Sequence, residues 1–274
     1  MVPRVPITHR DEEYDSLVFD VLRDMQLRHF WYIGRHRFIF HALKHYMAQI
    51  PARDRGLRAI DVGGGCGGWV DYLSRRLPGA FDELALADSS LKALELAKPI
   101  LNPKAKRYQI DLLNSGWTNR WDLIFLLDVV EHIPPDQKVF DEAMKILSPG
   151  GLLIVTAPAL KFFWSYNDEM VHHVRRYSRR DYRQLGESAG LNVLLTRYFM
   201  FFLSPLLLLS RMKTVDVKNM KPEEISAYIA KTHRVPAIPL NQVMTAIFSL
   251  ETPIGHWIPF PWGTSILGVF QKPI

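Results

Sequence analysis

Short apolar runs and amphipathic segments alternate along residues 57–158. The apolar runs have the length of buried strands, and the segments between them have the spacing of helices that pack one face against a core. Strands that alternate with helices in this rhythm predict a parallel sheet with helices on both faces. We expect strands at 58–62, 83–87, 105–110, 121–127 and 152–156, helices at 68–77, 90–101 and 136–147, and a closing turn at 148–151.

The pattern differs on either side of this stretch. Residues 11–50 have helical spacing, and His29-Phe30-Trp31-Tyr32 is expected to interrupt the helix before a second one at 34–49. The apolar face of the first helix carries Tyr14, Leu17, Val18, Val21 and Leu22. Beyond the alternating stretch, the pattern predicts a helix at 179–189, a strand at 192–201, a mostly helical insertion at 204–258 and a last strand at 264–271. The expected division is a helical cap at 1–56, a core formed by 57–203 and 264–274, and a helical insertion at 204–263.

Composition places the chain among ordinary globular proteins. Its 274 residues are 48% hydrophobic and 23% charged, a balance typical of a soluble protein with a full core. The single cysteine, Cys66, excludes an intrachain disulfide and suits a reducing compartment. Residues 1–6 have no apolar stretch of a signal peptide, so we expect a cytoplasmic protein. The net charge of +6 favours anionic partners, but the basic residues are scattered rather than massed in one tract.

The most apolar stretch of the chain is 198–210, which Pro205 breaks. It is too short to cross a bilayer as a helix. Its composition suits a buried strand end with a core helix, and it also leaves open a surface that lies on a membrane. The apolar residues of the whole insertion leave three roles open: an acceptor pocket, a homodimer contact, or a peripheral membrane contact.

A glycine-rich loop follows the first strand of the alternating stretch. Parallel-sheet proteins bind ligands beyond the carboxyl ends of their strands, and glycines let the backbone approach a ligand closely. Two glycine spacings fit this loop. Gly63-x-Gly65-x-x-Gly68 matches the fingerprint of dinucleotide binding, whereas Gly63-x-Gly65-x-Gly67 is a different spacing that does not match it. Asp61, which precedes the glycines, would repel a pyrophosphate but suits a ligand with a cationic amino-acid end and a sulfonium. Asp61 therefore favours S-adenosylmethionine over NAD.

The motif Asp61-x-Gly63-x-Gly65-x-Gly67 resembles motif I of the class I S-adenosylmethionine-dependent methyltransferases. The resemblance implies a doubly wound α/β fold, with a seven-stranded, mostly parallel sheet whose last strand is antiparallel. Cys66 departs from the Thr or Ser that the family commonly has, and its small side chain should still fit. The motifs at 29–32, 172–177 and 261–267 resemble the branch of small methyltransferases in polysaccharide, lipid or secondary-metabolite pathways.

The same resemblance implies roles for later residues. Asp88 matches the acid that holds the ribose hydroxyls, and Asp111 matches the residue that accepts from the adenine amino group. The segment 128–133 matches the family's motif at the end of the fourth strand. The cofactor-binding residues expected on this basis are Asp61, Gly63, Gly64, Gly65, Gly67, Asp88, Ser89, Asp111, Leu112, Asp128 and Val129.

Structural roles remain open for several of these residues. Asp88 can cap the following helix, although Ser89 and Ser90 also can. Asp111 can cap a turn. Glu131 and His132 can simply begin a short helix after the strand.

The acceptor site is expected on the loop 157–177, which should overhang the ligand end of the sheet. Methyl transfer needs mainly positioning, and a hydroxyl acceptor also benefits from a base, for which His132, His172 and His173 are the catalytic candidates. Asp168, His172 and His173 also suit a metal ion, but we expect no metal. The residues expected to bind the acceptor or to form a lid over the cofactor are Trp31, Tyr32, Arg35, Trp164, Arg176 and Tyr177.

The sequence therefore predicts an S-adenosylmethionine-dependent methyltransferase that acts at oxygen on a small-molecule or lipid-like acceptor with a histidine base. Two alternatives remain: an NAD-dependent oxidoreductase, and a non-catalytic protein that uses its cofactor pocket to bind a partner. A nucleic-acid acceptor is not expected, because no Asn-Pro-Pro-Tyr or similar base-flipping signature follows the fourth strand.

Overall fold

The computed structural model describes residue 7 and residues 19–211, 216–232 and 234–274. The strands are β1 Leu57–Val62, β2 Phe81–Asp88, β3 Lys106–Gln109, β4 Trp121–Leu127, β5 Leu147–Pro158, β6 Asn192–Phe199 and β7 Ser265–Gln271. The α-helices are α1 Phe19–Arg28, α2 Phe30–Tyr46, α3 Gly68–Arg76, α4 Leu91–Ala97, α5 Asp136–Ile146, α6 Tyr166–Met170, α7 Arg179–Ser188, α8 Ser204–Ser210, α9 Pro222–Thr232 and α10 Ile238–Trp257. Short 3-10 helices lie at η2 Met47–Gln49, η3 Leu112–Asn114, η4 Val130–His132, η5 Lys161–Phe163 and η6 Val217–Asn219.

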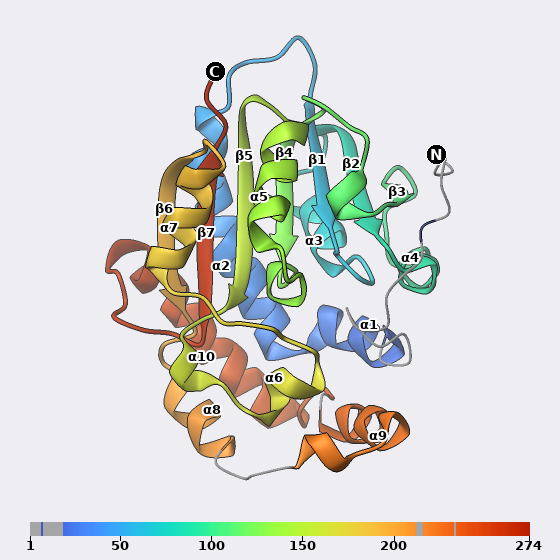
Figure 1. The fold of residues 1–274 in the computed structure, drawn as a ribbon, viewed down its shortest axis with the longest axis vertical. Coiled ribbons are helices and arrows are strands. Elements are labelled where there is room, and N and C mark those ends of the chain that lie inside the picture. Colours follow the sequence, from blue (N-terminus) through green and yellow to red (C-terminus); the bar gives the residue numbers. More distant parts are fainter. Residues whose placement is uncertain (1–6, 8–18, 212–215, 233) are drawn as a thin grey trace.

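The strands form one seven-stranded sheet in the order β3-β2-β1-β4-β5-β7-β6 (Figure 1). β1 to β5 are parallel, and β7 lies antiparallel between β5 and β6. The strand order reverses beside β1, where the chain passes from β3 back to β4. This reversal is the switch point at which open α/β sheets bind their ligands, so the sheet topology directs attention to the ends of β1 and β4.

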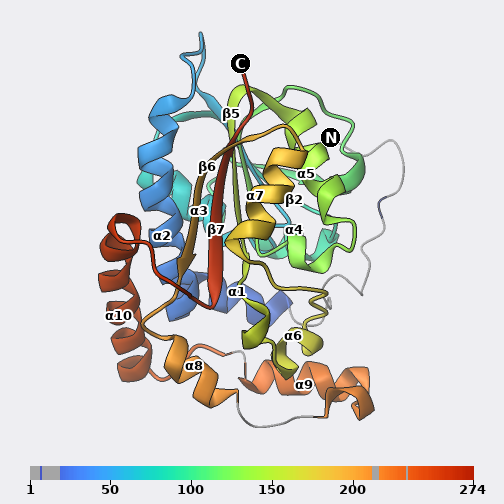
Figure 2. The same cartoon turned by 60° about the vertical axis from the view of Figure 1, so that its left-hand side comes forward.

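Helices cover both faces of the sheet (Figure 2). A hydrophobic core lies between each helical layer and the sheet. On one face, α2, α3, α4 and α10 contribute side chains such as Phe38 and Phe248. On the other, α5 and α7 contribute Phe140 and Tyr182. The central strands are apolar on both sides because both of their faces are covered, as the continuous burial of β4 shows. The predicted doubly wound α/β fold is therefore confirmed.

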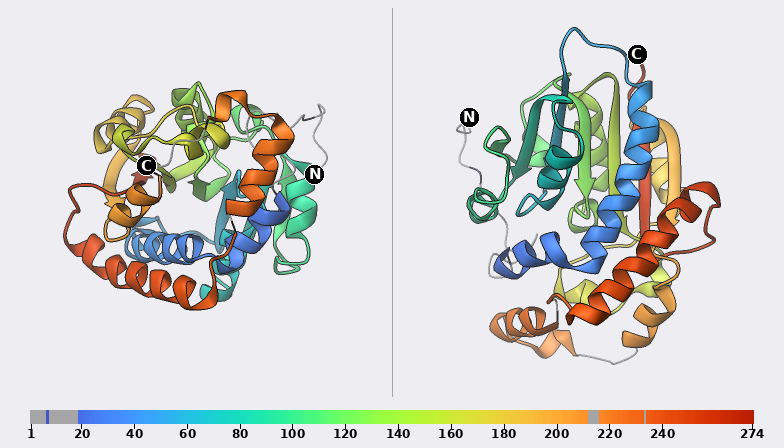
Figure 3. Two further views of the ribbon diagram at one scale, coloured as in Figure 1. Left: turned by 90° about the horizontal axis from the view of Figure 1, so that it is seen from below. Right: turned by 180° about the vertical axis from the view of Figure 1, so that it is seen from behind.

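Helices from both ends of the chain gather at the carboxyl edge of the parallel strands (Figure 3). α1, α6, α8 and α9 lie beyond this edge, and α10 packs along α2. The contact between α2 and α10 is close, since a Cβ atom added at Gly34 would lie 2.0 Å from Cδ1 of Phe248. The ends of β1 and β4 thus point toward α1, α6, α8 and α9.

Some element boundaries differ from those predicted. Only His29 separates α1 from α2, and it caps α2 by accepting a hydrogen bond from Trp31 N, so Phe30, Trp31 and Tyr32 belong to the helix that they were expected to interrupt. The expected closing turn at 148–151 instead lies within β5, beside a register shift in β4. Tyr14, Leu17 and Val18, expected on the apolar face of the first helix, lie outside the described residues.

Within the described ranges, no helix is both long enough and apolar enough to span a bilayer.

Candidate functional site

The glycine loop after β1 is held in a shape that suits glycine. Gly63 has a φ of +71° and Gly67 a φ of +81°, in the left-handed region that other residues rarely adopt. A Cβ atom at Gly63 would lie 2.7 Å from Cγ2 of Val129, in the loop after β4. The two loops thus touch at Gly63, and only a glycine fits there.

Asp88, at the end of β2, connects the glycine loop to the next loop along the sheet. Its Oδ2 accepts a hydrogen bond from Gly65 N at 3.0 Å, and its Oδ1 accepts one from Ser90 N at 2.8 Å. Ser90, and not Asp88, caps α4 by accepting from Ala93 N at 3.3 Å. Asp88 therefore does not cap the helix through its side chain, and it stands at the wall of the cavity described below.

Asp61 lies behind the glycine loop rather than on its open side. Its side chain is buried, and its Oδ1 has no hydrogen-bond partner within the described part of the chain. Burial raises the pKa of Asp61 to about 7, against the opposing attraction of Arg35. A Cβ atom at Gly64 would lie 2.3 Å from Asp61 Oδ2, so the carboxylate presses directly on the loop backbone.

A cavity of about 390 Å³ opens beyond these loops, a size in the range of small-molecule and cofactor sites. α1 and α2 form one wall, the loops after β1, β2 and β4 form the floor, and α6 and α8 contribute to the far side. The predicted site residues that line it are Trp31, Tyr32, Arg35, Gly63, Gly65, Asp88, Ser89, Asp128, Val129, His132, His173 and Arg176.

The remaining predicted residues do not line this cavity. Asp111 is exposed, and its Oδ1 accepts from Leu113 N at 2.9 Å, so it caps η3. His172 is exposed on a turn with a φ of +58°. Tyr177 is buried, and its hydroxyl donates to Val130 O at 3.1 Å, which ties down η4. The predicted residues outside the described cavity lining are Asp61, Gly64, Gly67, Asp111, Leu112, Trp164, His172 and Tyr177.

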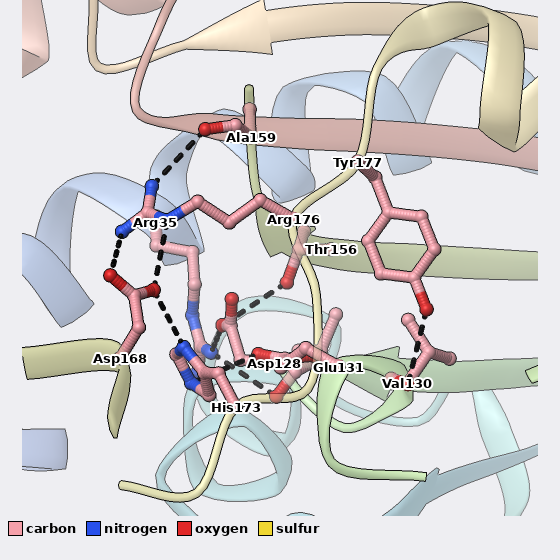
Figure 4. A network of polar contacts seen from close by, with 11 residues as sticks. Arg35, Asp128, Val130, Glu131, Thr156, Ala159, Asp168, His173, Arg176 and Tyr177 are labelled. Atoms are coloured by element: carbon pink, nitrogen blue, oxygen red, sulfur yellow. Dashed lines mark hydrogen bonds and ion pairs between the residues drawn. The ribbon is translucent and has the colours of Figure 1, made fainter. Parts of the chain in front are cut away.

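Arg35 connects the helical wall to the end of β4 (Figure 4). Its guanidinium forms an ion pair with Asp128 and lies 4.9 Å from the ring centres of both Trp31 and Tyr32. Asp128 has a φ of +61° and accepts a second hydrogen bond from Thr156 Oγ1 at 3.2 Å. A partly buried ion pair thus joins the start of α2 to the loop after β4.

His173 belongs to a second polar network, centred on Asp168 (Figure 4). The Nδ1 atom of His173 lies 2.9 Å from Asp168 Oδ1, and Arg176 donates to both carboxylate oxygens at 2.8 and 3.0 Å. Burial would raise the pKa of Asp168, but the hydrogen bonds and charges of His173 and Arg176 outweigh it and hold the pKa at about 2. Asp168 is therefore ionised and fixes the orientation of the imidazole.

Glu131 and His132 stand beside His173, on η4. Glu131 is fully buried, and neither of its carboxyl oxygens has a hydrogen-bond partner among the described residues. Burial, and then the charge of Asp128, raises the pKa of Glu131 well above its usual range. One ligand atom each from Glu131, His132 and His173 lies within 4.8 Å of the others, a grouping that can hold a metal ion.

Gln26, Glu131 and Arg211 line the cavity but were not among the site residues predicted from the sequence. Gln26 of α1 donates from Nε2 to Gly64 O at 3.2 Å and accepts from Gly68 N at 3.1 Å, so it clamps the glycine loop. Its position four residues after Leu22, on the same helix face, is a signal that could have indicated its burial. Arg211 lines the cavity at the end of α8. Nothing in the sequence near Arg211 points to that location.

The chain matches a family model described as a methyltransferase domain over residues 33–196. It is 34% identical over 112 residues to a trans-aconitate 2-methyltransferase from Rhizobium leguminosarum bv. trifolii. It is 28% identical over 106 residues to a ubiquinone biosynthesis O-methyltransferase from Psychrobacter cryohalolentis. The matched segments cover 41% and 37% of this chain, and 42% and 40% of the two relatives, so the chain matches about two fifths of the length of each.

Solved structures show the same fold at low sequence identity. The cyclase SpnF has a TM-score of 0.58 at 17% identity, covering 100% of this chain and 98% of that one. A phosphoethanolamine N-methyltransferase from Haemonchus contortus, in complex with S-adenosyl-L-methionine, has a TM-score of 0.53 at 15% identity, covering 93% of this chain and 60% of that one. The sheet order, the glycine loop and the family match agree, and the chain belongs to the methyltransferase-domain family, the class I S-adenosylmethionine-dependent methyltransferases.

Proposed function

We propose that this protein transfers the methyl group of S-adenosylmethionine to a hydroxyl oxygen of a small-molecule or lipid-like acceptor, with His173 as the general base. The observation that carries this proposal is the Asp168–His173 pair in the wall of the cavity that the cofactor loops also line. A carboxylate that holds one imidazole nitrogen leaves the other available to accept a proton.

The residues of the cavity floor suit the cofactor. A sulfonium and an ammonium need negative charge nearby, and the acidic residues Asp88 and Asp128 line the cavity. Gly63 and Gly65 allow a close approach of the ligand to the backbone. S-adenosylmethionine supplies the activated methyl group. In this proposal Asp88 and Ser89 hold the ribose, and the loop from Gly63 to Gly67 holds the amino-acid end.

The reaction is an in-line displacement. The acceptor oxygen attacks the methyl carbon, the O–CH3 bond forms as the S–CH3 bond breaks, and the hydroxyl proton passes to His173 Nε2. The products are the methylated acceptor and S-adenosylhomocysteine. Trp31 and Tyr32 exclude water from the cavity, and Arg35 fixes these two side chains by lying against their rings.

Of the three candidate histidines, His173 fits the base role best on geometry. His172 is exposed and lies outside the cavity lining. His132 also lines the cavity, but it is the ring of His173 that the carboxylate of Asp168 contacts and orients. Burial, together with His173 and His172, lowers the pKa of His132 to about 3.

The cavity wall suits an acceptor with an apolar body. Beyond the polar floor, its lining includes Phe19, Leu22, Met25, Ile133, Val171, Met200 and Leu207. The name of the Psychrobacter relative, an O-methyltransferase of ubiquinone biosynthesis, supports oxygen as the methylated atom.

The test is turnover with a panel of hydroxylated acceptors, together with calorimetry of S-adenosylhomocysteine and NAD. Replacement of His173 by alanine should lower kcat about a hundredfold or more, within the usual range for loss of a general base, and leave S-adenosylhomocysteine affinity unchanged. His172→Ala is the matched control and should keep wild-type kcat. Tight binding of NAD alone, or an equal loss of activity in both variants, would contradict the proposal.

We also propose that α8 and α10 contact a lipid surface, from which a lipid-like acceptor reaches the cavity. Leu207 of α8 lines the cavity, while its neighbours Leu206, Leu208 and Leu209 are exposed. On α10, Val243, Leu250 and Trp257 are also exposed, Trp257 by 86%. Co-sedimentation with anionic vesicles should fall in Leu209→Ser and Trp257→Ser variants. A homodimer in sedimentation velocity that the same variants dissociate would assign these helices to a subunit interface instead.

A further inference from the structure

The side chains of Glu131, His132 and His173 converge on one point at the cavity wall. One carboxylate oxygen and one nitrogen from each ring lie within 4.8 Å of one another, so small rotations bring all three to a shared ion. All three residues line the cavity, so an ion there is accessible to small ligands. The three come from two segments, η4 and the turn after α6, that are far apart in the sequence.

Glu131 provides the second observation that points to a cation. Its side chain is completely buried, and within the described residues neither of its oxygens accepts a hydrogen bond. A buried carboxyl without partners destabilises a fold unless it is paired or coordinates a metal. The neighbouring cations do not satisfy it, because Arg35 forms an ion pair with Asp128 and Arg176 with Asp168.

The surroundings of the cluster hold its members in place. Asp168 fixes Nδ1 of His173 at 2.9 Å, which leaves Nε2 3.8 Å from Glu131 Oε1. Val174 N donates to the backbone oxygen of Glu131 at 2.9 Å, so the turn after α6 is fixed to η4. A carboxylate behind a ligating histidine is the usual outer support of a protein metal site.

We propose that Glu131, His132 and His173 bind one divalent transition-metal ion. Two imidazoles and one carboxylate favour ions such as Zn²⁺, Co²⁺ or Fe²⁺ over Mg²⁺ and Ca²⁺, which prefer oxygen ligands. Three protein ligands leave a coordination position free toward the cavity.

This ion would share a nitrogen with the proposed chemistry. Nε2 of His173 cannot accept a proton while it ligates a metal, so metal loading regulates the base. This consequence for turnover rests on the proposed function, whereas metal binding itself does not. We expect the metal-loaded protein to turn over at least tenfold more slowly than the chelator-treated protein. If loading raised turnover instead, the metal site would stand and the assignment of His173 as base would fall.

The binding test uses the full, tag-free chain after treatment with a chelator. Equilibrium dialysis against Zn²⁺ should give one equivalent bound, and Co²⁺ should give a visible absorption band of low-symmetry coordination. Glu131→Gln, which keeps the shape of the side chain, and His132→Ala should each lower affinity at least tenfold. Asp168→Asn, which reaches the three proposed ligands through its contact with His173, should lower it tenfold to a hundredfold.

Two controls keep the test specific. His172→Ala removes a neighbouring exposed histidine and should bind the metal like the wild type. Binding of S-adenosylhomocysteine confirms that each variant is folded and separates a failure of the metal site from a failure of the cofactor site. Less than one equivalent bound by the wild type, or full binding by the Glu131→Gln, His173→Ala double variant, overturns the proposal.

Discussion

Asp61 is a carboxyl group that the fold buries at a cost. Burial raises the pKa of Asp61 to about 7 in the folded chain. In the unfolded chain the carboxyl titrates at about 3.9, so the folded chain keeps the carboxyl proton to a higher pH. The folded state is therefore penalised progressively as the pH rises from about 4 to about 7. A residue that costs stability at neutral pH is typical of a site kept for function.

Replacement of Asp61 by asparagine should remove this pH-dependent cost. We expect Asp61→Asn to match the wild type in stability near pH 4 and to exceed it by about 1–4 kcal/mol at pH 8. Its affinity for S-adenosylmethionine should fall, because the negative charge behind the loop is lost. Urea unfolding at pH 4 and pH 8 measures the stability effect, and calorimetry at pH 8 measures the affinity. A stability difference that does not change with pH would refute the account.

Gly63 is a second single residue on which the site depends. Alanine at this position would be strained by its φ of +71° and would meet Val129, so S-adenosylhomocysteine affinity should fall at least tenfold. Gly116→Ala is a matched control, because Gly116 has the same φ of +71° but no atom within 4 Å of an added Cβ. Calorimetry that showed equal affinity losses in the two variants would exclude the contact with Val129 as the cause.

Residue patterns predicted where part of the candidate site lies in the fold. Asp88 ends β2 and Asp128 directly follows β4, so their place at the carboxyl edge of the sheet follows from topology alone. Asp111 also follows a strand, yet η3 turns it outward to cap its own backbone. The choice between capping and ligand binding depends on where the loop goes after the strand, which local sequence does not specify. The pairing of Asp168 with His173 and the isolation of Glu131 likewise depend on tertiary packing.

At the scale of elements, Glu251 connects α10 to the end of β6. It is fully buried, and its carboxylate accepts hydrogen bonds from Met200 N and, at 2.9 Å, from Phe202 N. Met200 has a φ of +62° and lines the cavity. The position of this cavity residue thus depends on a helix that lies far away in the sequence.

Glu251→Leu should destabilise the protein by about 2–4 kcal/mol, because the buried N–H of Met200 and the partly buried N–H of Phe202 lose their acceptor. It should also weaken acceptor binding more than cofactor binding, since Met200 lies on the apolar side of the cavity. Leu250→Ala, at the adjacent position, which is 67% exposed, should change stability by less than about 0.5 kcal/mol. Thermal unfolding of both variants tests this, and similar losses in the two would contradict it.

Elements with regular periodicity were predicted correctly, and irregular ones were not. The strands β1, β2 and β4 and the helices α3, α5 and α7 have patterns long enough to be decisive. The extended backbone at 148–151 carries Pro149 and two glycines, residues typical of turns. It lies between the β4-paired residues Leu147 and Leu152, and it continues β5 because Gly150 N and Gly151 O bond to the backbone of Lys272. α2 begins earlier than the aromatic residues at 30–32 indicate, because His29 caps the helix directly before them.

At the scale of the whole molecule, the cap and the insertion share one core with the sheet. Phe38 of α2, Phe248 of α10 and Leu267 of β7 belong to the same buried cluster. The division into a cap at 1–56 and an insertion at 204–263 remains a prediction from the sequence. Because the described helices of both parts pack into the core of the sheet, we expect these parts to unfold together with it.

We therefore expect a single cooperative transition that moves as a whole when ligand binds. S-adenosylhomocysteine at one hundred times its Kd should add about 2.7 kcal/mol to the free energy of unfolding. Far-UV and near-UV circular dichroism should report coincident transitions with and without it. An early transition that S-adenosylhomocysteine does not shift would show that α8 to α10 form a separate unit.

The position of β7 determines the order in which the sheet is completed. β6 lies at the edge and pairs only with β7, which follows it in the chain after the whole insertion. β6 therefore has no strand to join until this long loop closes, and such closures are slow. Pulse-labelled hydrogen exchange during refolding should find the amides of β6 and β7 protected last, and early protection of β6 would contradict this. Until that step, β5 presents an open strand edge, which is the feature of a folding chain most prone to aggregation.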